Sequence, residues 1–251
     1  MTLDELKATL DTFSPVKIEF VARVMESLAN PPNSVIKQHG TWLTGSAEWI
    51  EYFGLALSVH HSATAEPLGL TAFEAVFRNA CDHLGWPTDP PGSRTRRFVD
   101  LTVRPTGKPE RRLSLKSTAA RRLSNTSLHI SKLTEAAWVQ DARTARDRKS
   151  RTQALFRQYQ SAVTHIVMLR AFRESQDEVP SRYQLVEIPA RIFASVRRAP
   201  LSVFERDAPL IECEIGGNQV AVVAIDRSDA KITVRRVRLS ACTVHAEWSR
   251  G

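Results

Sequence analysis

Two runs of sequence decide the fold: RFVDLTV at residues 97–103 and RLSLKST at residues 112–118, joined by RPTGKPE. Apolar and polar residues alternate in both runs, which is the period of two expected of a strand with one buried face. Proline and glycine in the joining segment favour a turn. We therefore predict a β-hairpin in which Val99, Leu101 and Val103 share one face.

The opposite face of this hairpin carries ionisable side chains. A hairpin symmetric about Lys108 places Asp100 opposite Lys116, on the same face and close enough to interact. A carboxylate beside an ammonium group can be an ordinary ion pair. It can also be a metal ligand beside a catalytic lysine, and the residues alone leave both interpretations open.

The composition is that of a globular protein without a membrane helix. The 251 residues are 42% apolar, enough for one large core with one or two smaller lobes. No apolar run approaches the roughly 18 residues that a membrane helix needs, and the acidic, amphipathic N-terminus is unlike a secretion signal. The three cysteines have no paired spacing, which is typical of reduced thiols, so we expect a cytoplasmic protein.

The net charge of +8 is concentrated around the hairpin. Residues 94–122 contain ten Lys or Arg and two acidic residues. Such a basic segment favours a polyanionic partner, and nucleic acid is the commonest. A solvated basic surface is the alternative explanation of the same composition.

Hydrophobic periodicity and breakers divide the chain into three regions. Residues 1–66 have the pattern of amphipathic helices, and residues 67–190 that of an α/β core with a mixed sheet flanked by helices. In this core, helices are predicted over residues 70–84 and 127–162, and strands over 165–170 and 183–188. Residues 191–251 are β-rich, with strands predicted over 210–215, 220–225 and 231–244.

Several other chemistries lack their motifs. The sequence has no G-x-x-x-x-G-K-[ST] phosphate-binding loop and no G-x-S-x-G nucleophile elbow, so ATP-driven and serine-hydrolase activities are set aside. His60 and His61 have no further ligand beside them at metal-site spacing. They are better explained as the end of a helix.

The residues around Asp100 resemble a known family. Asp100, a hairpin, Ser114-Leu115-Lys116, then helix and strand, is similar to the PD-(D/E)xK nuclease core, and most closely to type II restriction endonucleases. The resemblance covers roughly residues 70–190, and would make residues 67–190 the nuclease core. It implies Mg²⁺-dependent cleavage of double-stranded DNA at a specific sequence by a homodimer, since two symmetry-related sites most simply cut both strands.

The resemblance also assigns roles to residues. Asp100 becomes the metal ligand, the backbone carbonyl of Leu115 a further ligand, and Lys116 the lysine that orients or deprotonates the attacking water. The family's second acid falls at Ser114, which has no carboxylate. Glu74, on the helix before the hairpin, is the first candidate to replace it. Glu135 and Asp141, on the helix expected after the hairpin, are weaker candidates.

Residues flanking the catalytic pair are predicted to contact DNA. Arginine matches phosphate bidentately, so backbone contacts are expected from Arg94, Arg96 and Arg97. Contacts with phosphates or base edges are expected from Ser117, Thr118, Arg121, Arg122 and Asn125. Helix capping and surface charge would explain the latter residues equally well.

Two other functions remain open from the sequence. One is a structure-selective or repair nuclease built on the same core. The other is a non-catalytic DNA-binding protein in which the Asp100–Lys116 pair is architectural. In each case the N-terminal helices and the C-terminal β lobe would grasp DNA or mediate dimerisation.

Overall fold

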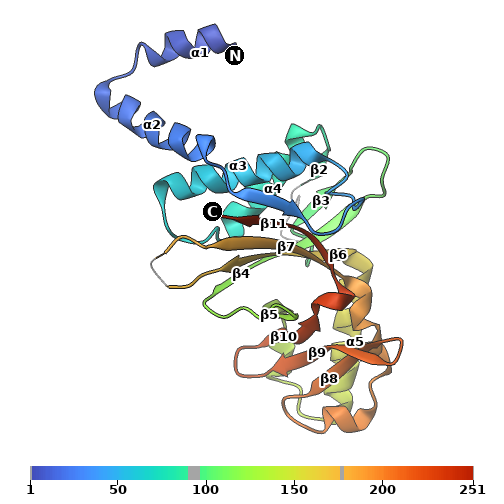
Figure 1. Cartoon of the computed structure of the whole chain (residues 1–251). Coiled ribbons are helices and arrows are strands. Elements are labelled where there is room, and N and C mark those ends of the chain that lie inside the picture. Colours follow the sequence, from blue (N-terminus) through green and yellow to red (C-terminus); the bar gives the residue numbers. More distant parts are fainter. Residues whose placement is uncertain (1, 90–96, 176–177, 251) are drawn as a thin grey trace.

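A computed structural model (Figure 1) describes residues 2–89, 97–175 and 178–250, and within them the strands form two sheets. The larger sheet is mixed and contains, in spatial order, β1 (Asn33–Ile36), β11 (Thr243–Ser249), β7 (Arg182–Pro189), β6 (His165–Phe172), β4 (Arg111–Ala120), β3 (Leu101–Val103) and β2 (Thr88–Asp89). The smaller sheet is antiparallel and contains β5 (Ser127–Glu135), β10 (Lys231–Arg238), β9 (Asn218–Asp226) and β8 (Leu210–Ile215). The predicted fold class, a mixed sheet with N-terminal helices and a β-rich C-terminal part, is confirmed.

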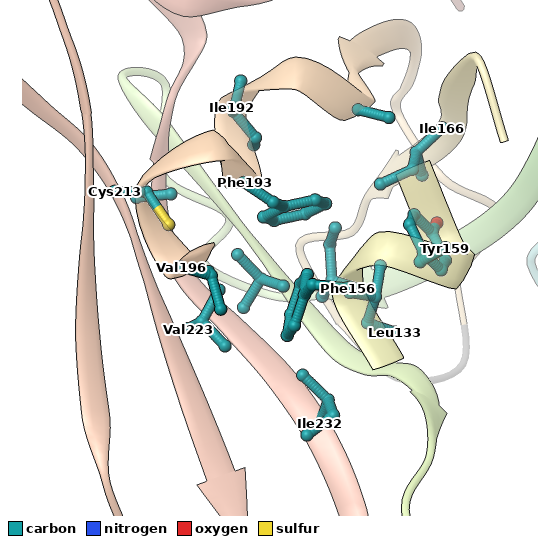
Figure 2. Close-up of a cluster of buried hydrophobic side chains, with 14 of the residues drawn as sticks. Leu133, Phe156, Tyr159, Ile166, Ile192, Phe193, Val196, Cys213, Val223 and Ile232 are labelled. Atoms are coloured by element: carbon teal, nitrogen blue, oxygen red, sulfur yellow. The ribbon is translucent and has the colours of Figure 1, made fainter. Parts of the chain in front are cut away.

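Helices cover both faces of the larger sheet. On one face lie α3 (Ala47–Ala63) and α4 (Leu70–His83), whose Phe53 and Phe73 share a buried core with Leu113 and Leu115 of β4. The other face is covered by α5 (Ala145–Ala162), together with the smaller sheet. Figure 2 shows Phe156 of α5 in this second core. Four 3₁₀ segments connect the elements: η1 (Ala137–Val139), η2 (Ala190–Arg198), η3 (Leu201–Phe204) and η4 (Leu239–Ala241).

The N-terminal helix α1 (Leu3–Leu10) and the first part of α2 (Pro15–Ala29) extend away from the rest of the molecule (Figure 1), whereas the later part of α2 contacts α3. Neither helix has a buried residue. None of the helices in the described ranges combines the length and the apolar character needed to cross a membrane. Cys81, Cys213 and Cys242 are free thiols, as their spacing predicts.

The parallel pairing of β4 with β6 forms the centre of the larger sheet. Residues 113–120 pair in register with residues 165–172, and β7 lies antiparallel on the far side of β6. Strands covered on both faces are mostly apolar, and β6 is buried over nearly its whole length, with Arg170 as its buried charged residue. The alternation along β4 points Leu113 and Leu115 toward α3 and α4, as predicted.

The predicted register of the hairpin is wrong by two residues, because the centre of the hairpin lies one residue earlier than predicted. Leu101 pairs with Leu113 and Val103 with Arg111, so the hairpin is symmetric about Gly107. Gly107 adopts a φ of +68°, which glycine accepts without steric cost, and the turn geometry fixes the register. Asp100 therefore comes next to Ser114.

Val99 does not share a face with Leu101 and Val103. Val99 packs in the core beneath α5, whereas the other two pack under α3 and α4. Phe98, just before it, has a φ of +81°, a conformation that bulky residues rarely adopt. The turn at Phe98 interrupts the alternation of apolar and polar residues, so Val99 lies on the other side of the sheet from Leu101.

The helix predicted over residues 127–162 is wrong in its first part. Ser127–Glu135 forms β5, and α5 begins only at Ala145. Leu128 and Ile130 are buried while His129 is exposed, which is the period of a strand, and pairing with β10 places the two apolar side chains in the core. Glu135 and Asp141 consequently do not lie on a helix.

Two smaller predictions also need correction. Residues 1–66 are not wholly helical, because β1 pairs with β11 at the edge of the larger sheet. Its four residues are too few for periodicity to identify them. The strand predicted over residues 231–244 is divided: β10 ends at Arg238, η4 follows, and the chain then enters the larger sheet as β11.

Candidate active site

Asp100 lies at the start of β3, where the hairpin opens. Its backbone N–H donates to the carbonyl oxygen of Leu113 at 2.8 Å, which anchors it to β4. The side chain is 32% exposed, so its carboxylate meets solvent on one side and the sheet on the other. This position leaves room for a substrate on the solvent side.

Three donors from β4 converge on one oxygen of Asp100. Oδ2 accepts the backbone N–H of Leu115 at 2.7 Å and the hydroxyl of Ser114 at 3.2 Å. The ammonium group of Lys116 lies 3.5 Å from the same oxygen. The predicted proximity of Asp100 and Lys116 is therefore present, although the register that brings them together differs from the one expected.

Lys116 is held by more than its ion pair. Its Nζ also donates to Ser114 Oγ at 2.9 Å and to the carbonyl oxygen of Leu115 at 3.0 Å. The side chain is only 17% exposed. A half-buried ammonium with three oxygen partners has a fixed position, as a group that must orient a water molecule requires.

Ser114, at the position where the resemblance predicts a second acid, is itself nearly fully buried. Its hydroxyl donates to Asp100 and accepts from Lys116, so it links the two charged groups. Serine therefore serves here as an orienting group for the neighbouring carboxylate and ammonium.

Tyr159 of α5 lies near Ser114, and its buried hydroxyl has no hydrogen-bond partner among the described residues. Its side chain is fully buried, and burial raises the pKa of the hydroxyl, with Asp100 contributing in the same direction and Ser114 opposing. Its ring packs edge-to-face on Phe98 with centroids 5.3 Å apart. Sequence reasoning places Tyr159 on the stripe of α5 that faces the sheet, but it does not identify Ser114 as its neighbour. The sequence signal that points to this neighbour is the alternation along β4, which places Ser114 on the side of the sheet that α5 covers.

Glu74 of α4 approaches the same site. Its pKa is raised, first by burial and then by the negative charge of Asp100, while Lys116 opposes the shift. Glu74 is thus close enough to both residues to interact with their charges. Among the described acids, Glu135 is 77% exposed and pairs with Lys132 at 2.9 Å, and Asp141 is exposed after η1. Of these three acids, Glu74 is the one whose pKa responds to both Asp100 and Lys116.

The donor chemistry of the site fits a hard divalent cation, which prefers oxygen ligands. Glu74 and Asp100 supply two carboxylates, and their mutual repulsion is what such a cation relieves. In the parts of the chain that the structure describes, no set of three His, Cys, Asp or Glu side chains could hold a metal. A third protein donor would be a backbone oxygen, and that of Leu115 already accepts a hydrogen bond from the Lys116 ammonium group.

The residues predicted to contact DNA lie on both sides of this site. Arg94 and Arg96 fall outside the described residues. Arg97 is exposed, and its guanidinium donates to the carbonyl oxygen of Glu135 at 3.1 Å. Further along β4 and its following loop, Ser117 and Thr118 are half-buried, and Arg121, Arg122 and Asn125 are exposed.

Comparison with known proteins agrees with this chemistry. The SmaI family model, described as type II site-specific deoxyribonuclease, matches residues 6–250. The chain is also 24% identical over 211 residues to the type II restriction enzyme SmaI of Serratia marcescens, an alignment that covers 80% of this chain and 79% of that enzyme. No solved structure matches the chain.

Proposed function

Since the chain belongs to the SmaI family of type II site-specific deoxyribonucleases, we propose that Asp100, Lys116 and Glu74 form its active site. Membership of this family makes the chain a restriction enzyme that cleaves DNA at a specific sequence. It also sets aside the two alternatives, a repair nuclease and a non-catalytic binding protein. The observation that supports this active site most directly is the convergence of Ser114, Leu115 and Lys116 on one oxygen of Asp100.

We propose Mg²⁺ as the cofactor and double-stranded DNA as the substrate. Asp100, Glu74 and the carbonyl oxygen of Leu115 would hold the ion. When bound, Mg²⁺ neutralises charge on the phosphate and lowers the pKa of its water. The oxygen donors support this choice, because Mg²⁺ is bound through one or two carboxylates and keeps several waters.

The residues of the chain would orient the attacking water, stabilise charge and position one another. Hydrolysis joins a water oxygen to phosphorus and breaks the bond to the 3′-oxygen. Lys116 would orient that water and hold positive charge near the phosphate as negative charge develops. Leu115 N–H and Ser114 fix the carboxylate of Asp100, and Ser114 fixes the ammonium of Lys116, so both groups are positioned before substrate arrives.

The experiment that tests the site is cleavage of plasmid DNA. The wild-type protein with Mg²⁺ should give discrete fragments, and EDTA should stop cutting. Glu74→Gln should then require more Mg²⁺ for the same rate. Smears or nicks alone from the wild type would contradict site-specific cleavage of both strands.

We further propose a cytoplasmic homodimer. The free thiols support a reducing compartment. The arm formed by α1 and α2 supports association, because Val16 and Phe20 expose 77% and 63% of their surfaces and neither helix buries a residue. Short helices are marginal in water unless an apolar face is covered. A second copy of the chain is the simplest partner to bury this apolar face, since cutting both DNA strands requires two active sites.

The three regions remain a proposed division. Residues 67–190 would form the nuclease core, and residues 1–66 and 191–251 would serve association and DNA binding. Each flanking region nevertheless contributes a strand, β1 or β11, to the larger sheet.

A further inference from the structure

The smaller sheet has one outer face that is strongly basic along two neighbouring strands. Alternate residues of β5 and β10, such as Ile130 and Val234, enter the core beneath the sheet. Five exposed residues on these strands carry positive or ionisable basic groups. We call this set the basic face: His129, Lys132, Arg235, Arg236 and Arg238.

A β-bulge places two consecutive arginines on this face. Val234 pairs with Ile130 and Val237 with Leu128, so Arg235 and Arg236 together lie opposite the single residue His129. Arg236 adopts a φ of +54°, a left-handed conformation that is unfavourable for a residue with a side chain and costs glycine almost nothing. The chain thus keeps a guanidinium at a position where the backbone favours glycine.

The basic face has little countercharge. Among the described residues, Arg235, Arg236 and Arg238 form no ion pair with a carboxylate, whereas Lys132 pairs with Glu135. The pKa of His129 is lowered, first by burial and then by the charges of Arg235 and Lys231. The sheet is also asymmetric, because exposed acids, Glu212 and Glu214, lie on β8 at the opposite edge.

Both ends of β5 connect to segments that flank the catalytic pair. Its first residue follows the loop that leaves β4, the strand of Lys116, and Asn125 of this loop lines a cavity of about 830 Å³ with Arg236 and Arg238. Its last residue, Glu135, accepts a hydrogen bond from Arg97, three residues before Asp100. The basic face therefore begins and ends beside chain segments that lead directly to the site.

We propose that the basic face of β5 and β10 is a contact surface for the DNA duplex that the active site cleaves. A two-stranded antiparallel ribbon fits the major groove, and arginine forks suit phosphate oxygens and base edges. The guanidinium groups of the basic face that have no carboxylate partner are available to pair with the phosphates of a polyanion. The inference rests on the proposed function and deepens it by placing the substrate on a second element.

The test compares Arg236→Gly with Ala230→Gly. Ala230 has a φ of +48° in the turn before β10, so glycine there relieves the same backbone strain without removing a charge. Binding is measured without Mg²⁺, by fluorescence anisotropy at several salt concentrations. The probes are a plasmid-derived duplex containing one mapped cut site and a duplex of the same length without it.

Arg236→Gly should keep or raise the thermal midpoint and bind the cut-site duplex at least about tenfold more weakly. Its slope of log K against log salt should be smaller by about 0.9 for each phosphate that the variant no longer neutralises. Ala230→Gly should bind as the wild type does. Weaker binding of both probes indicates that Arg236 meets phosphates, and weaker binding of the cut-site probe alone indicates that it meets bases; either supports the proposal.

Wild-type affinity and salt slope in both Arg236→Gly and the double variant Arg235→Ala/Arg236→Gly would overturn the inference. That failure is separate from failure of the proposed function. The latter would appear as a wild-type protein that binds but does not cut with Mg²⁺, whereas the binding measurement contains no Mg²⁺ and involves no cutting.

Discussion

The hydroxyl of Ser114 lies 3.2 Å from Oδ2 of Asp100, on the neighbouring strand of the same hairpin. A nuclease of the PD-(D/E)xK type would be expected to carry a second acid at this position. Here the hydroxyl orients the first acid instead, and an acid from another element, Glu74 of α4, comes to the site. The proposed catalytic arrangement therefore depends on packing between α4 and the hairpin.

The role of Ser114 predicts a defect in catalysis together with a loss of stability. Ser114→Ala removes hydrogen bonds to Asp100 and Lys116, each worth about 1.5–3 kcal/mol because a charged group is involved. We expect kcat to fall at least about tenfold, measured by single-turnover cleavage. Ser58→Ala, a buried serine of α3, is the control and should cut normally. Unchanged kcat in Ser114→Ala would show that the hydroxyl does not orient the site.

The role of Glu74 predicts a change in metal dependence. Glu74→Gln keeps the size of the side chain but removes a carboxylate that would hold Mg²⁺, so the Mg²⁺ concentration for half-maximal cleavage should rise at least about tenfold. A Mg²⁺ titration of the cleavage rate measures this. Glu51→Gln, an exposed acid of α3, is the matched control. Wild-type metal dependence in Glu74→Gln would exclude Glu74 as a ligand.

The raised pKa of Glu74 predicts a pH dependence of stability. Its pKa lies above the ordinary 4.5 chiefly because of burial and next because of Asp100, so folding favours the protonated form. The contribution of Glu74 to the free energy of unfolding is complete below the pKa that Glu74 has in the unfolded state. It is lost as pH rises through the pKa that Glu74 has in the folded state. Urea unfolding in EDTA should show the wild type losing stability relative to Glu74→Gln across this window. A stability difference that does not change with pH would contradict the prediction.

The exposed arm predicts association through α1 and α2. Replacing Val16 and Phe20 together by Asp places charges on their apolar stripe, and the molar mass from light scattering should fall from that of a dimer to that of a monomer. Cleavage of both strands should fall with it. Leu210→Asp, at an exposed leucine of β8, is the control and should remain dimeric. A wild type that is monomeric at micromolar concentration, with or without DNA, would exclude the dimer.

Much of the core was predictable because its signals are local. Alternation identifies β4 and the side of the sheet taken by Leu113 and Lys116, and the amphipathic stripe of α4 places Glu74 at its edge. The register was not predictable to one residue, because it depends on the turn at Gly107, whose left-handed φ the sequence does not specify.

The rest depended on contacts between residues distant in the sequence. Leu128 and Ile130 are compatible with a helix until β10, about a hundred residues later, pairs with them. The contact of Tyr159 with Ser114 likewise requires α5 to be placed on the sheet. The sequence shows a serine, Ser114, where the resemblance predicts an acid, but its hydrogen bonds to Asp100 and Lys116 are visible only in the structure.

The central claim is that Lys116 acts in catalysis and not in DNA binding. The most direct measurement compares Lys116→Ala with Lys108→Ala, a lysine in the turn of the same hairpin, in plasmid cleavage with Mg²⁺ and in duplex binding without it. We expect Lys116→Ala to lose at least about 100-fold in cleavage rate while binding the duplex within about threefold of the wild type, and Lys108→Ala to cut normally. Undiminished cutting by Lys116→Ala would contradict the assignment of the active site.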